Sequence, residues 1–320
     1  MDQRNVSESN LKTGGGDGSA RQPLAEAVQN GDAALVARLR ADGAAPDTPF
    51  PDGRTALMQA ARRNRADIAG LLIEAGASLK AVDADGGTPL FHAILGKSEA
   101  VVHLLIERGT DLNQPLAGGF PPLLCAAGVG SVEIVRRLLD AGQDIDQRGP
   151  GGLTALALTA SEGDPAMVSL LLERGAGIEL GDDHRCTPLH LAAGALNVEA
   201  VELLLQAGAN PDARNFMGGA PIHMAMLRRQ GRPESAEMVQ TVLALLDGGA
   251  DPNLQDELVG SPLTAAFENA FETTAGFLLD CGAVLGHGEG DLSDLIWMAE
   301  ERGLEGLAER VRKMMPEAPS

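Results

Sequence analysis

Apolar residues in this chain recur at helical spacing in short, paired segments. After Thr187, the apolar positions Leu189, Ala192 and Ala193 fall on one face, which predicts a short helix with small residues at its contact surface. After a turn, the same spacing is repeated at Val198, Val201, Leu204 and Leu205. Gly208 follows, and glycine ends helices because it adopts positive φ without a steric penalty. The stretch therefore predicts a helix–turn–helix unit.

This unit recurs along the chain with a period of 33 residues. Its first helix is represented by TALMQAA at Thr55, TPLFHAI at Thr88, PPLLCAA at Pro121, TALALTA at Thr154, TPLHLAA at Thr187 and APIHMAM at Ala220. Its end is marked by Gly43, Gly76, Gly109, Gly142, Gly175 and Gly208. The next interval in both series is 41 residues, to Ser261 and Gly249, so one unit carries an insertion. A fixed period in this range predicts a solenoid, in which each unit buries its apolar face against its neighbours.

The pattern TPLHLAA…VELLLQAGANPD resembles the ankyrin repeat family, and the resemblance covers roughly Gln22 to Met315. It implies an all-α ankyrin-repeat solenoid of about nine helix–turn–helix units, joined by hairpin-like loops and capped at both ends. We expect repeats one to eight at 21–286 and a truncated capping repeat at 287–315, where Trp297 takes the position of His190. Residues 1–20 are polar and glycine-rich, which predicts a disordered tail, and 316–320 form a second tail.

His190, in TPLH, is the first residue that invites a catalytic interpretation. In the ankyrin repeat family, the threonine and histidine of this motif hydrogen-bond the turn and the loop between units, and His223 matches the same position. Sister units have other side chains there, namely Phe91, Leu124, Ala157 and Thr264. Because such different side chains serve at one position, we interpret His190 as architectural.

The net charge constrains the partner. The chain has 25 basic and 45 acidic side chains, which gives a formal charge of −20. Residues 161–320 hold 10 basic and 26 acidic groups, so the acidity is concentrated in the second half. Such a field speeds the capture of a protein with a basic surface, and the alternative is a solvated surface kept soluble by repulsion. Direct binding to nucleic acid or to an anionic membrane is not expected, because phosphate contacts need clustered Lys and Arg.

The cysteines and the apolar segments bear on the cellular setting. Cys125, Cys186 and Cys281 are an odd number without a CxxC motif, which favours a reducing compartment and a cytoplasmic protein. The first residues lack the apolar region of a secretory signal, and no apolar run is long enough to span a membrane. Arginine outnumbers lysine 21 to 4, a bias typical of GC-rich bacterial genomes.

Candidate catalytic and metal-binding groups are weak. The segment DDHRC at Asp182–Cys186 has metal-capable side chains, but it lies in a loop and lacks a second ligand pair at zinc spacing. GGGDG near Gly14 has no strand before it, so it does not predict a phosphate-binding loop. His92 and Cys125 occupy equivalent inward positions of adjacent units, yet a nucleophile would also need an orienting group and a pocket. We therefore predict no enzyme activity, no cofactor and no metal site.

Recognition of a protein partner is the remaining function. In the ankyrin repeat family, partners usually bind the concave side, which is made of loop tips and the exposed ends of the first helices. Apolar side chains at these positions are unusual for loops, and the alternative is that each folds back onto a neighbouring unit. The predicted partner-binding residues, apolar ones flanked by carboxylates, are Leu95, Phe120, Val129, Leu153, Glu162, Asp183, Phe216, Met217, Leu227, Glu257, Leu258 and Glu268.

Two basic features stand apart from this acidic chain. Arg54, Arg62, Arg63 and Arg65 form a cluster that either holds a separate acidic element or is a soluble edge. The insertion of the seventh unit, near 229–237, contains further arginines and then Pro233, Glu234 and Glu237, a pattern that predicts the start of a lengthened second helix. The insertion is either functional or a tolerated change at the loop end opposite the hairpin tips.

The sequence thus predicts a non-catalytic protein–protein interaction module, an adaptor or inhibitor that is monomeric when free. One alternative is an immunity-type inhibitor of a cationic toxin or nuclease, because ankyrin proteins of bacterial origin include such inhibitors. A second alternative is a secreted bacterial effector that uses the repeats to bind a host protein. A chain that also delivered chemistry would need a catalytic module, and too little sequence lies outside Gln22–Met315 to form one.

Overall fold

The computed structural model describes residues 21–227, 233–256, 260–284 and 292–314. Over these residues the chain forms nine consecutive pairs of α-helices, and strand-like pairing is limited to one bridge between Asp256 and Gly260. The first helices are α1 (Arg21–Asn30), α3 (Ala56–Arg62), α5 (Pro89–Leu95), α7 (Pro122–Gly128), α9 (Ala155–Glu162), α11 (Pro188–Ala195), α13 (Pro221–Met226), α15 (Pro262–Glu268) and α17 (Leu292–Glu301). The second helices are α2 (Ala33–Ala41), α4 (Ala66–Glu74), α6 (Glu99–Glu107), α8 (Val132–Asp140), α10 (Pro165–Glu173), α12 (Val198–Gln206), α14 (Ala236–Asp247), α16 (Glu272–Asp280) and α18 (Glu305–Met314). The predicted all-α architecture is confirmed, while the predicted tails at 1–20 and 316–320 lie outside the described residues.

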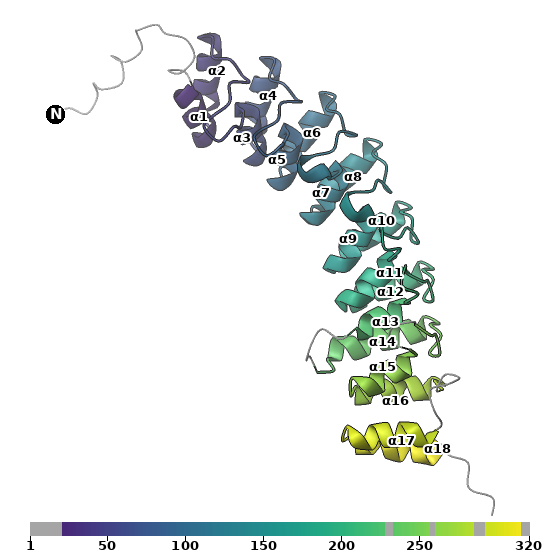
Figure 1. Cartoon of the computed structure of the whole chain (residues 1–320). Coiled ribbons are helices and arrows are strands. Elements are labelled where there is room, and N and C mark those ends of the chain that lie inside the picture. Colours follow the sequence, from purple (N-terminus) through teal and green to yellow (C-terminus); the bar gives the residue numbers. More distant parts are fainter. Residues whose placement is uncertain (1–20, 228–232, 257–259, 285–291, 315–320) are drawn as a thin grey trace, which may run out of the picture. The chain divides into compact units, whose positions relative to one another are not determined.

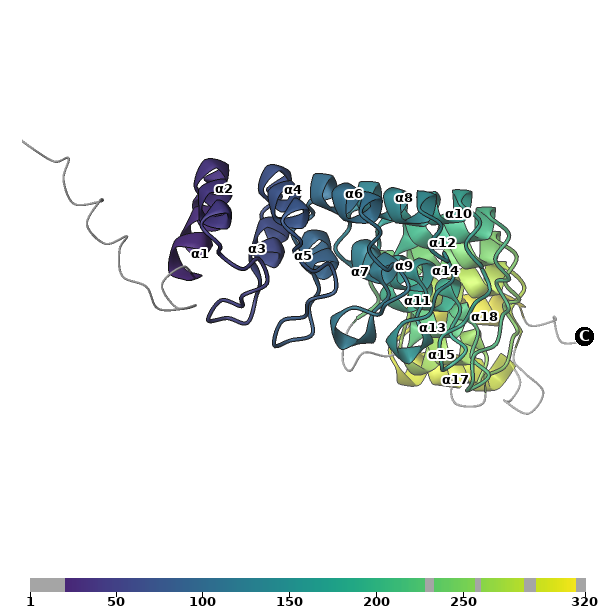
Figure 2. The same cartoon turned by 90° about the horizontal axis from the view of Figure 1, so that it is seen from above.

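The chain divides into two compact units, with the boundary between Gln143 and Asp144. Unit 1 contains α1 to α8, and within it neighbouring first helices contact one another, as do neighbouring second helices. Figure 2 shows the two resulting rows in unit 1, with α1, α3, α5 and α7 in one row and α2, α4, α6 and α8 in the other. Unit 2 repeats this arrangement from α9 to α18 (Figure 1). Each helix pair is therefore one layer of a stack within its unit.

Several first helices begin directly after a hydroxyl side chain, whereas α7 and α13 follow Pro121 and Ala220. The side-chain oxygen of Thr88 accepts a hydrogen bond from the Phe91 amide at 3.2 Å. Ser261 does the same for the Thr264 amide at 3.2 Å, even though the preceding unit is longer. Such a bond satisfies an amide that the first helical turn leaves unpaired. Where the repeat has a threonine or serine at this position, as at Thr88, Thr154 and Ser261, its hydroxyl therefore fixes the start of the helix.

The second helices end at the glycine series, as Gly109 illustrates. Its φ is 78°, and its amide donates to the carbonyl oxygen of Ile106 at 3.0 Å. The Thr110 amide donates to the carbonyl oxygen of Leu105 at 3.1 Å, which completes the left-handed end that follows many helices. This turn directs the chain away from the helix pair and into the loop that leads to the next repeat.

The loops between repeats are hairpins closed by one recurring backbone hydrogen bond. The amide of one residue donates to the carbonyl of the residue four positions later, in the pairs Phe50 to Arg54, Asp83 to Gly87, Leu116 to Phe120, Gly149 to Leu153, Asp182 to Cys186, Asn215 to Gly219 and Asp256 to Gly260. In unit 2 the hairpins also bond one another, because the Phe216 amide donates to the carbonyl oxygen of His184 at 2.8 Å. Two hairpins contain a short 3-10 turn, η1 (Ala117–Gly119) and η2 (Pro150–Gly152). The predicted hairpin-like loops are confirmed.

The core lies between the two helices of each pair and between successive pairs. In the second repeat, Ala60 and Ala61 of α3 and Ile68 and Leu72 of α4 are fully buried. Alanine in the first helices lets backbones approach closely, and the branched residues of the second helices fill the space that remains. Few large aromatic residues are therefore part of the core, and those that are include Phe50 in unit 1 and Phe267 and Phe271 in unit 2.

The seventh repeat departs from the others, as its longer spacing predicts. Its first helix, α13, has 6 residues, and its second helix, α14, has 12, whereas α10, α12 and α16 have 9 each. The lengthening of the second helix is therefore confirmed. A helix start at Pro233 is wrong: the hydroxyl of Ser235 accepts from the Met238 amide at 3.2 Å, so the helix begins at Ala236. The arginines of the insertion, Arg228, Arg229 and Arg232, lie outside the described residues.

Candidate functional site

Unit 1 holds three of the predicted apolar contact residues. Leu95 at the end of α5 and Phe120 at the end of the hairpin before α7 are each 37% exposed. The Phe120 ring lies against its own hairpin, because a Cβ at Gly118 would stand 3.2 Å from its Cδ2 atom. Val129, directly after α7, is half-buried. Unit 1 thus presents a modest apolar surface, with part of each side chain already covered.

Unit 2 presents the most exposed aromatic side chain at a hairpin tip among the described residues. Phe216 is 75% exposed, and Met217 beside it is 54% exposed. Their hairpin is held in place, because the side-chain oxygen of Asn215 accepts from the amides of Met217 and Gly219, both at 3.0 Å. Leu153, at the tip of an earlier hairpin, is half-buried. A rigid loop that exposes two large apolar side chains is suited to contact with another protein.

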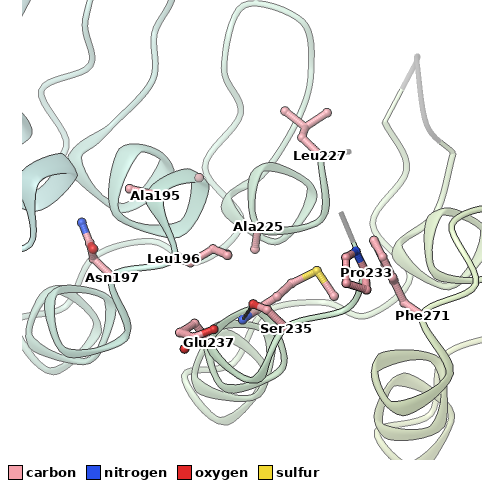
Figure 3. A pocket seen from close by; sticks show the side chains of 11 residues that line it. Ala195, Leu196, Asn197, Ala225, Leu227, Pro233, Ser235, Glu237 and Phe271 are labelled. Atoms are coloured by element: carbon pink, nitrogen blue, oxygen red, sulfur yellow. Dashed lines mark hydrogen bonds between the residues drawn. The ribbon is translucent and has the colours of Figure 1, made fainter. Parts of the chain in front are cut away.

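The opposite end of the first helices in unit 2 is hollowed on both sides of Leu227. This residue follows α13 and is 47% exposed. One pocket of about 450 Å³ is lined by the C-terminal ends of α11 and α13 and by the N-terminal end of α14. Asn197 lies at one end of this pocket and Phe271 at the other (Figure 3). A second pocket of about 490 Å³ lies between Leu227 and Arg302. Both hollows have room for at least one apolar side chain from a partner.

The carboxylates of unit 2 differ in their exposure and in whether backbone amides already bond to them. Glu162, Asp183 and Glu268 are exposed. Partial burial raises the pKa of Glu162 above its usual value, and the nearby Asp164 carboxylate adds to this effect. Asp182, in contrast, is used by its own hairpin, because its Oδ1 atom accepts from the His184 and Cys186 amides at 2.8 Å. Two further predicted residues, Glu257 and Leu258, lie outside the described residues.

His190 is fully buried and joins two repeats. Its Nδ1 atom lies 3.2 Å from the Thr187 amide, and its Nε2 atom lies 3.0 Å from the carbonyl oxygen of Gly219 in the next hairpin. Because the amide can only donate and the carbonyl can only accept, the ring is neutral and protonated on Nε2. Burial lowers the pKa of His190 below its usual value, which keeps this neutral form. The architectural interpretation is confirmed.

His223 repeats this arrangement one unit later. Its Nδ1 accepts from the Ala220 amide at 3.2 Å, and its Nε2 lies 3.0 Å from the carbonyl oxygen of Leu254. Trp297, at the equivalent position of the last described repeat, is instead 61% exposed. The two histidines at this position therefore each contact the loop of the following repeat, whereas Trp297 is open to water.

A buried acid–base pair in unit 1 was not predicted from the sequence. Asp83 and His92 are both buried, and the Oδ2 atom of Asp83 lies 2.6 Å from the Nε2 atom of His92. The other carboxylate oxygen of Asp83 accepts from the Gly87 amide at 2.7 Å and from the Asp85 amide at 3.0 Å. Although burial opposes it, these bonds and His92 lower the pKa of Asp83, so the carboxylate is ionised. Asp83 thus orients His92.

The pair does not activate a nucleophile among the described residues. The Nδ1 atom of His92 is buried and has no hydrogen-bond partner there, and burial is the main cause that lowers the pKa of this histidine. Cys125 lies on the next first helix, but burial raises the pKa of its thiol to about 11. A thiol with such a pKa is protonated at neutral pH and is a weak nucleophile. The geometry favours a structural role for all three residues.

The described residues contain no cluster of three His, Cys, Asp or Glu side chains arranged to hold a metal ion. No helix in the described part of the chain combines the length and apolar character of a membrane span.

The position of Asp83 within the repeat did contain a signal for its role. Asp182 and Asn215 occupy the equivalent hairpin position, and each accepts the same two amide hydrogen bonds.

Comparison with known proteins agrees with this geometry. A family model described as ankyrin repeats (3 copies) matches residues 24–115 and 119–215, which is more than half of the chain. A search of curated proteins finds no match. Among solved structures, the human ASB11 ankyrin repeat domain is similar with 30% sequence identity and a TM-score of 0.62, over 72% of this chain and 99% of that one. Ankyrin repeats form protein–protein interaction modules, and the fold is typically a non-catalytic scaffold. By the family model and this structural similarity together, the chain belongs to the ankyrin repeat family.

Proposed function

We propose that unit 2 binds a protein partner through the hairpin tip at Phe216 and Met217 and through the helix end at Leu227. The observation that carries this proposal is the 75% exposure of Phe216 on a hairpin that hydrogen bonds hold in place. A hairpin that is already ordered loses little backbone entropy on binding, and burying one aromatic side chain contributes about 1.5–3 kcal/mol. In unit 1, Leu95, Phe120 and Val129 offer a smaller surface of the same kind, which we propose as a second contact region.

We further propose that the partner has a basic surface. Residues 161–320 hold 26 acidic and 10 basic groups, and Glu162, Asp183 and Glu268 are exposed within this part of the chain. Exposed carboxylates around an apolar centre steer a cationic protein toward it and raise the association rate. Such a module acts as an adaptor or as an inhibitor that covers its partner. The acidic charge also favours a narrower candidate, an inhibitor of a cationic toxin or nuclease.

The test compares proteins captured by three forms of the immobilised chain. The first is the wild type, the second carries Phe216→Ser and Met217→Ser, and the third carries Val284→Ser as a control. Val284 suits this purpose because it is 61% exposed in the same unit but lies after a second helix and not at a hairpin tip. The proposal expects a protein that the wild type and the control retain and the double variant loses.

The captured protein is then purified and its affinity measured by calorimetry. Phe216→Ala should weaken binding at least about tenfold, near 1.4 kcal/mol, and Phe120→Ala tests the unit 1 region in the same way. Raising the salt concentration should slow association, since exposed charges are screened. Retention of the same proteins by all three immobilised forms would reject the tip as a binding site. A partner with an acidic surface would reject its proposed basic character.

A further inference from the structure

A second charged surface lies in unit 1, at the turns that join the two helices of repeats two and three. Arg62 is the last residue of α3, Arg63 and Arg65 lie between α3 and α4, and Lys97 lies between α5 and α6. All four side chains are exposed. We refer to these four residues as the turn cluster. It carries four positive charges on two adjacent turns of a chain whose net charge is −20.

The packing of the turns brings the cluster together. A Cβ at Gly96 would overlap the carbonyl oxygen of Arg62, so the turn that carries Lys97 lies directly against the end of α3. On the other side, a Cβ at Gly31 would overlap the Arg65 guanidinium, and Arg63 Nη1 donates to the carbonyl oxygen of Gln29 at 3.4 Å. Three consecutive turns of unit 1 therefore touch, and the cationic side chains lie over two of them.

The turn cluster has no ionic partner among the described residues. No carboxylate forms an ion pair with any of its four side chains there, although Asp67 and Glu99 follow in the first turns of α4 and α6. Other arginines of the chain are used by the fold: Arg40 donates to the carbonyl oxygen of Ala75, and Arg302 to that of Glu268. The positive charges of the cluster are thus available to an external anion.

Arg54, grouped with these arginines by sequence, does not belong to the cluster. Its guanidinium lies 3.5 Å from the Asp52 carboxylate of its own hairpin and 3.9 Å from the Asp83 carboxylate of the next hairpin, so it already has ionic partners. Lys97, in contrast, is more than thirty positions away from Arg62 in the sequence and joins the cluster only through the stacking of repeats. The cationic side chains that lie together are therefore those of Arg62, Arg63, Arg65 and Lys97, without Arg54.

Charge at the equivalent turn changes sign along the chain. In repeat five, Glu162 ends α9 and Asp164 lies between α9 and α10, with no basic residue beside them in this turn. Next to the turn cluster, Leu95 at the end of α5 is 37% exposed and offers an apolar contact one residue before Gly96. The surface in unit 1 thus combines unpaired cations with one partly exposed leucine.

We propose that the turn cluster binds an acidic segment of a partner protein, with carboxylates paired to Arg62, Arg65 and Lys97 and an apolar side chain against Leu95. Arginine suits this task because its guanidinium pairs with a carboxylate through two parallel hydrogen bonds. The site is separate from the surface in unit 2 and has the opposite charge preference. One chain would then hold a basic protein through unit 2 and an acidic segment through repeats two and three.

A peptide carboxylate is favoured over nucleic acid as the ligand. The cluster spans only two turns, and a long polyphosphate would extend from it over a chain with 45 acidic side chains. Nucleic-acid affinity grows with the number of phosphates that are neutralised, and four cations offer few. A short acidic segment avoids this repulsion, because its charge is confined to the width of the cluster.

The experiment uses the full chain and a fluorescein-labelled synthetic peptide of aspartates and glutamates with one central leucine. Binding is followed by fluorescence anisotropy in ~20 mM salt, where exposed charges are weakly screened. The charge-reversal variant Arg62→Glu with Arg65→Glu should weaken binding at least tenfold. The control variant Arg38→Glu with Arg136→Glu makes the same change in net charge at two exposed arginines of unit 1 outside the cluster, and should stay within twofold of the wild type.

Further measurements keep the outcome decisive if Arg65→Glu disturbs the adjacent turn. Arg62→Gln with Lys97→Gln leaves Arg65 in place and should also weaken binding several-fold, while circular dichroism checks that the variants are folded. A peptide with glutamines and asparagines in place of its acids should not bind. Equal losses in the control variant, or no loss in either cluster variant, would overturn the proposal. So would an oligothymidine probe that binds tighter than the peptide with the same dependence on Arg62, because that outcome assigns the cluster to nucleic acid.

Discussion

Glu234, in the inserted segment of repeat seven, is tied to Thr274 in the second helix of repeat eight. The Oε1 atom of Glu234 accepts hydrogen bonds from the Thr274 amide and from the Thr274 hydroxyl, both at 2.6 Å. Its Oε2 atom accepts from the Thr273 amide at 3.0 Å. These amides belong to the first turn of α16, which starts at Glu272 and has no partner for them within the helix. The insertion therefore supplies a cap to the neighbouring repeat.

This contact predicts that Glu234 contributes to stability. Burial opposes ionisation, but the hydrogen bonds from Thr274 and Thr273 outweigh it and lower the pKa of Glu234. Replacement by Gln removes the charge from bonds that stabilise an ion, so Glu234→Gln should lower the free energy of unfolding by about 1–2 kcal/mol at neutral pH. The change is measured by urea unfolding, followed by the fluorescence of Trp297, which is the only tryptophan of the chain and lies in unit 2.

Glu199→Gln is the matched control, because Glu199 is exposed in the first turn of α12 in the same unit. It should leave the unfolding midpoint nearly unchanged. The contribution of Glu234 has a defined pH dependence: its folded pKa is lowered, so its stabilisation is present above the unfolded value near 4.3 and is lost as the pH falls through the folded value. Identical unfolding curves for Glu234→Gln and Glu199→Gln would show that the hydrogen bonds of Glu234 do not stabilise the chain.

Replacing glycine by alanine should have opposite effects on stability at two positions of unit 1. Gly109 has a φ of 78°, and no atom would lie within 4 Å of an added Cβ, so Gly109→Ala is opposed by backbone strain and not by a collision. Its cost should be about 1 kcal/mol. Gly70 lies inside α4, also with no atom within 4 Å of an added Cβ, and Gly70→Ala should stabilise the chain by about 0.5–1 kcal/mol. Urea unfolding followed by circular dichroism measures both, and shifts of the same sign would contradict this account.

The helix register was predictable because it depends on local chemistry that recurs. Thr88 and Ser261 cap first helices, and Gly109 ends a second helix, each through groups within a few residues of itself. A sequence that repeats such groups at a fixed period specifies the fold many times over. The prediction held in the longer seventh repeat as well, because the insertion lies between two such signals.

Contacts between repeats were less predictable, because they depend on side-chain geometry and not on period. The Asp83–His92 pair joins a hairpin to its own helix, and its equivalents in other repeats use different side chains. Glu234 bonds to Thr274, forty positions away, from a segment that no other repeat has. The difference in exposure between Phe216 and Phe120 was also not predictable, since both are phenylalanines of hairpins and the sequence does not show which ring is covered.

The cysteines predict a distinct order of chemical reactivity. Burial raises the pKa of Cys125 to about 11, and it also raises that of Cys186, with a smaller effect from Asp182. Cys281 is exposed. Only the thiolate reacts with iodoacetamide, and at about pH 8 roughly one in a thousand Cys125 side chains is ionised. Peptide mass spectrometry should therefore find Cys281 alkylated first in the folded chain, and all three cysteines alkylated at similar rates in denaturant. Alkylation of Cys125 as fast as Cys281 would indicate a thiolate activated beside His92.

The buried histidines of unit 2 predict a loss of stability in mild acid. His190 and His223 are neutral in the folded chain, since burial lowers the pKa of each below the value near 6.5 expected after unfolding. As the pH falls through that value, the unfolded chain binds protons that the folded chain does not, so the free energy of unfolding decreases until the lowered folded pKa is reached. Each histidine adds up to about 1.4 kcal/mol per pH unit to this slope.

Urea unfolding between about pH 7.5 and 5.5 should show the slope in the wild type and a smaller one in the variant with His190→Gln and His223→Gln. A double variant with the full wild-type slope would mean that the two rings are charged inside the fold, which the carbonyl and amide partners of His190 oppose.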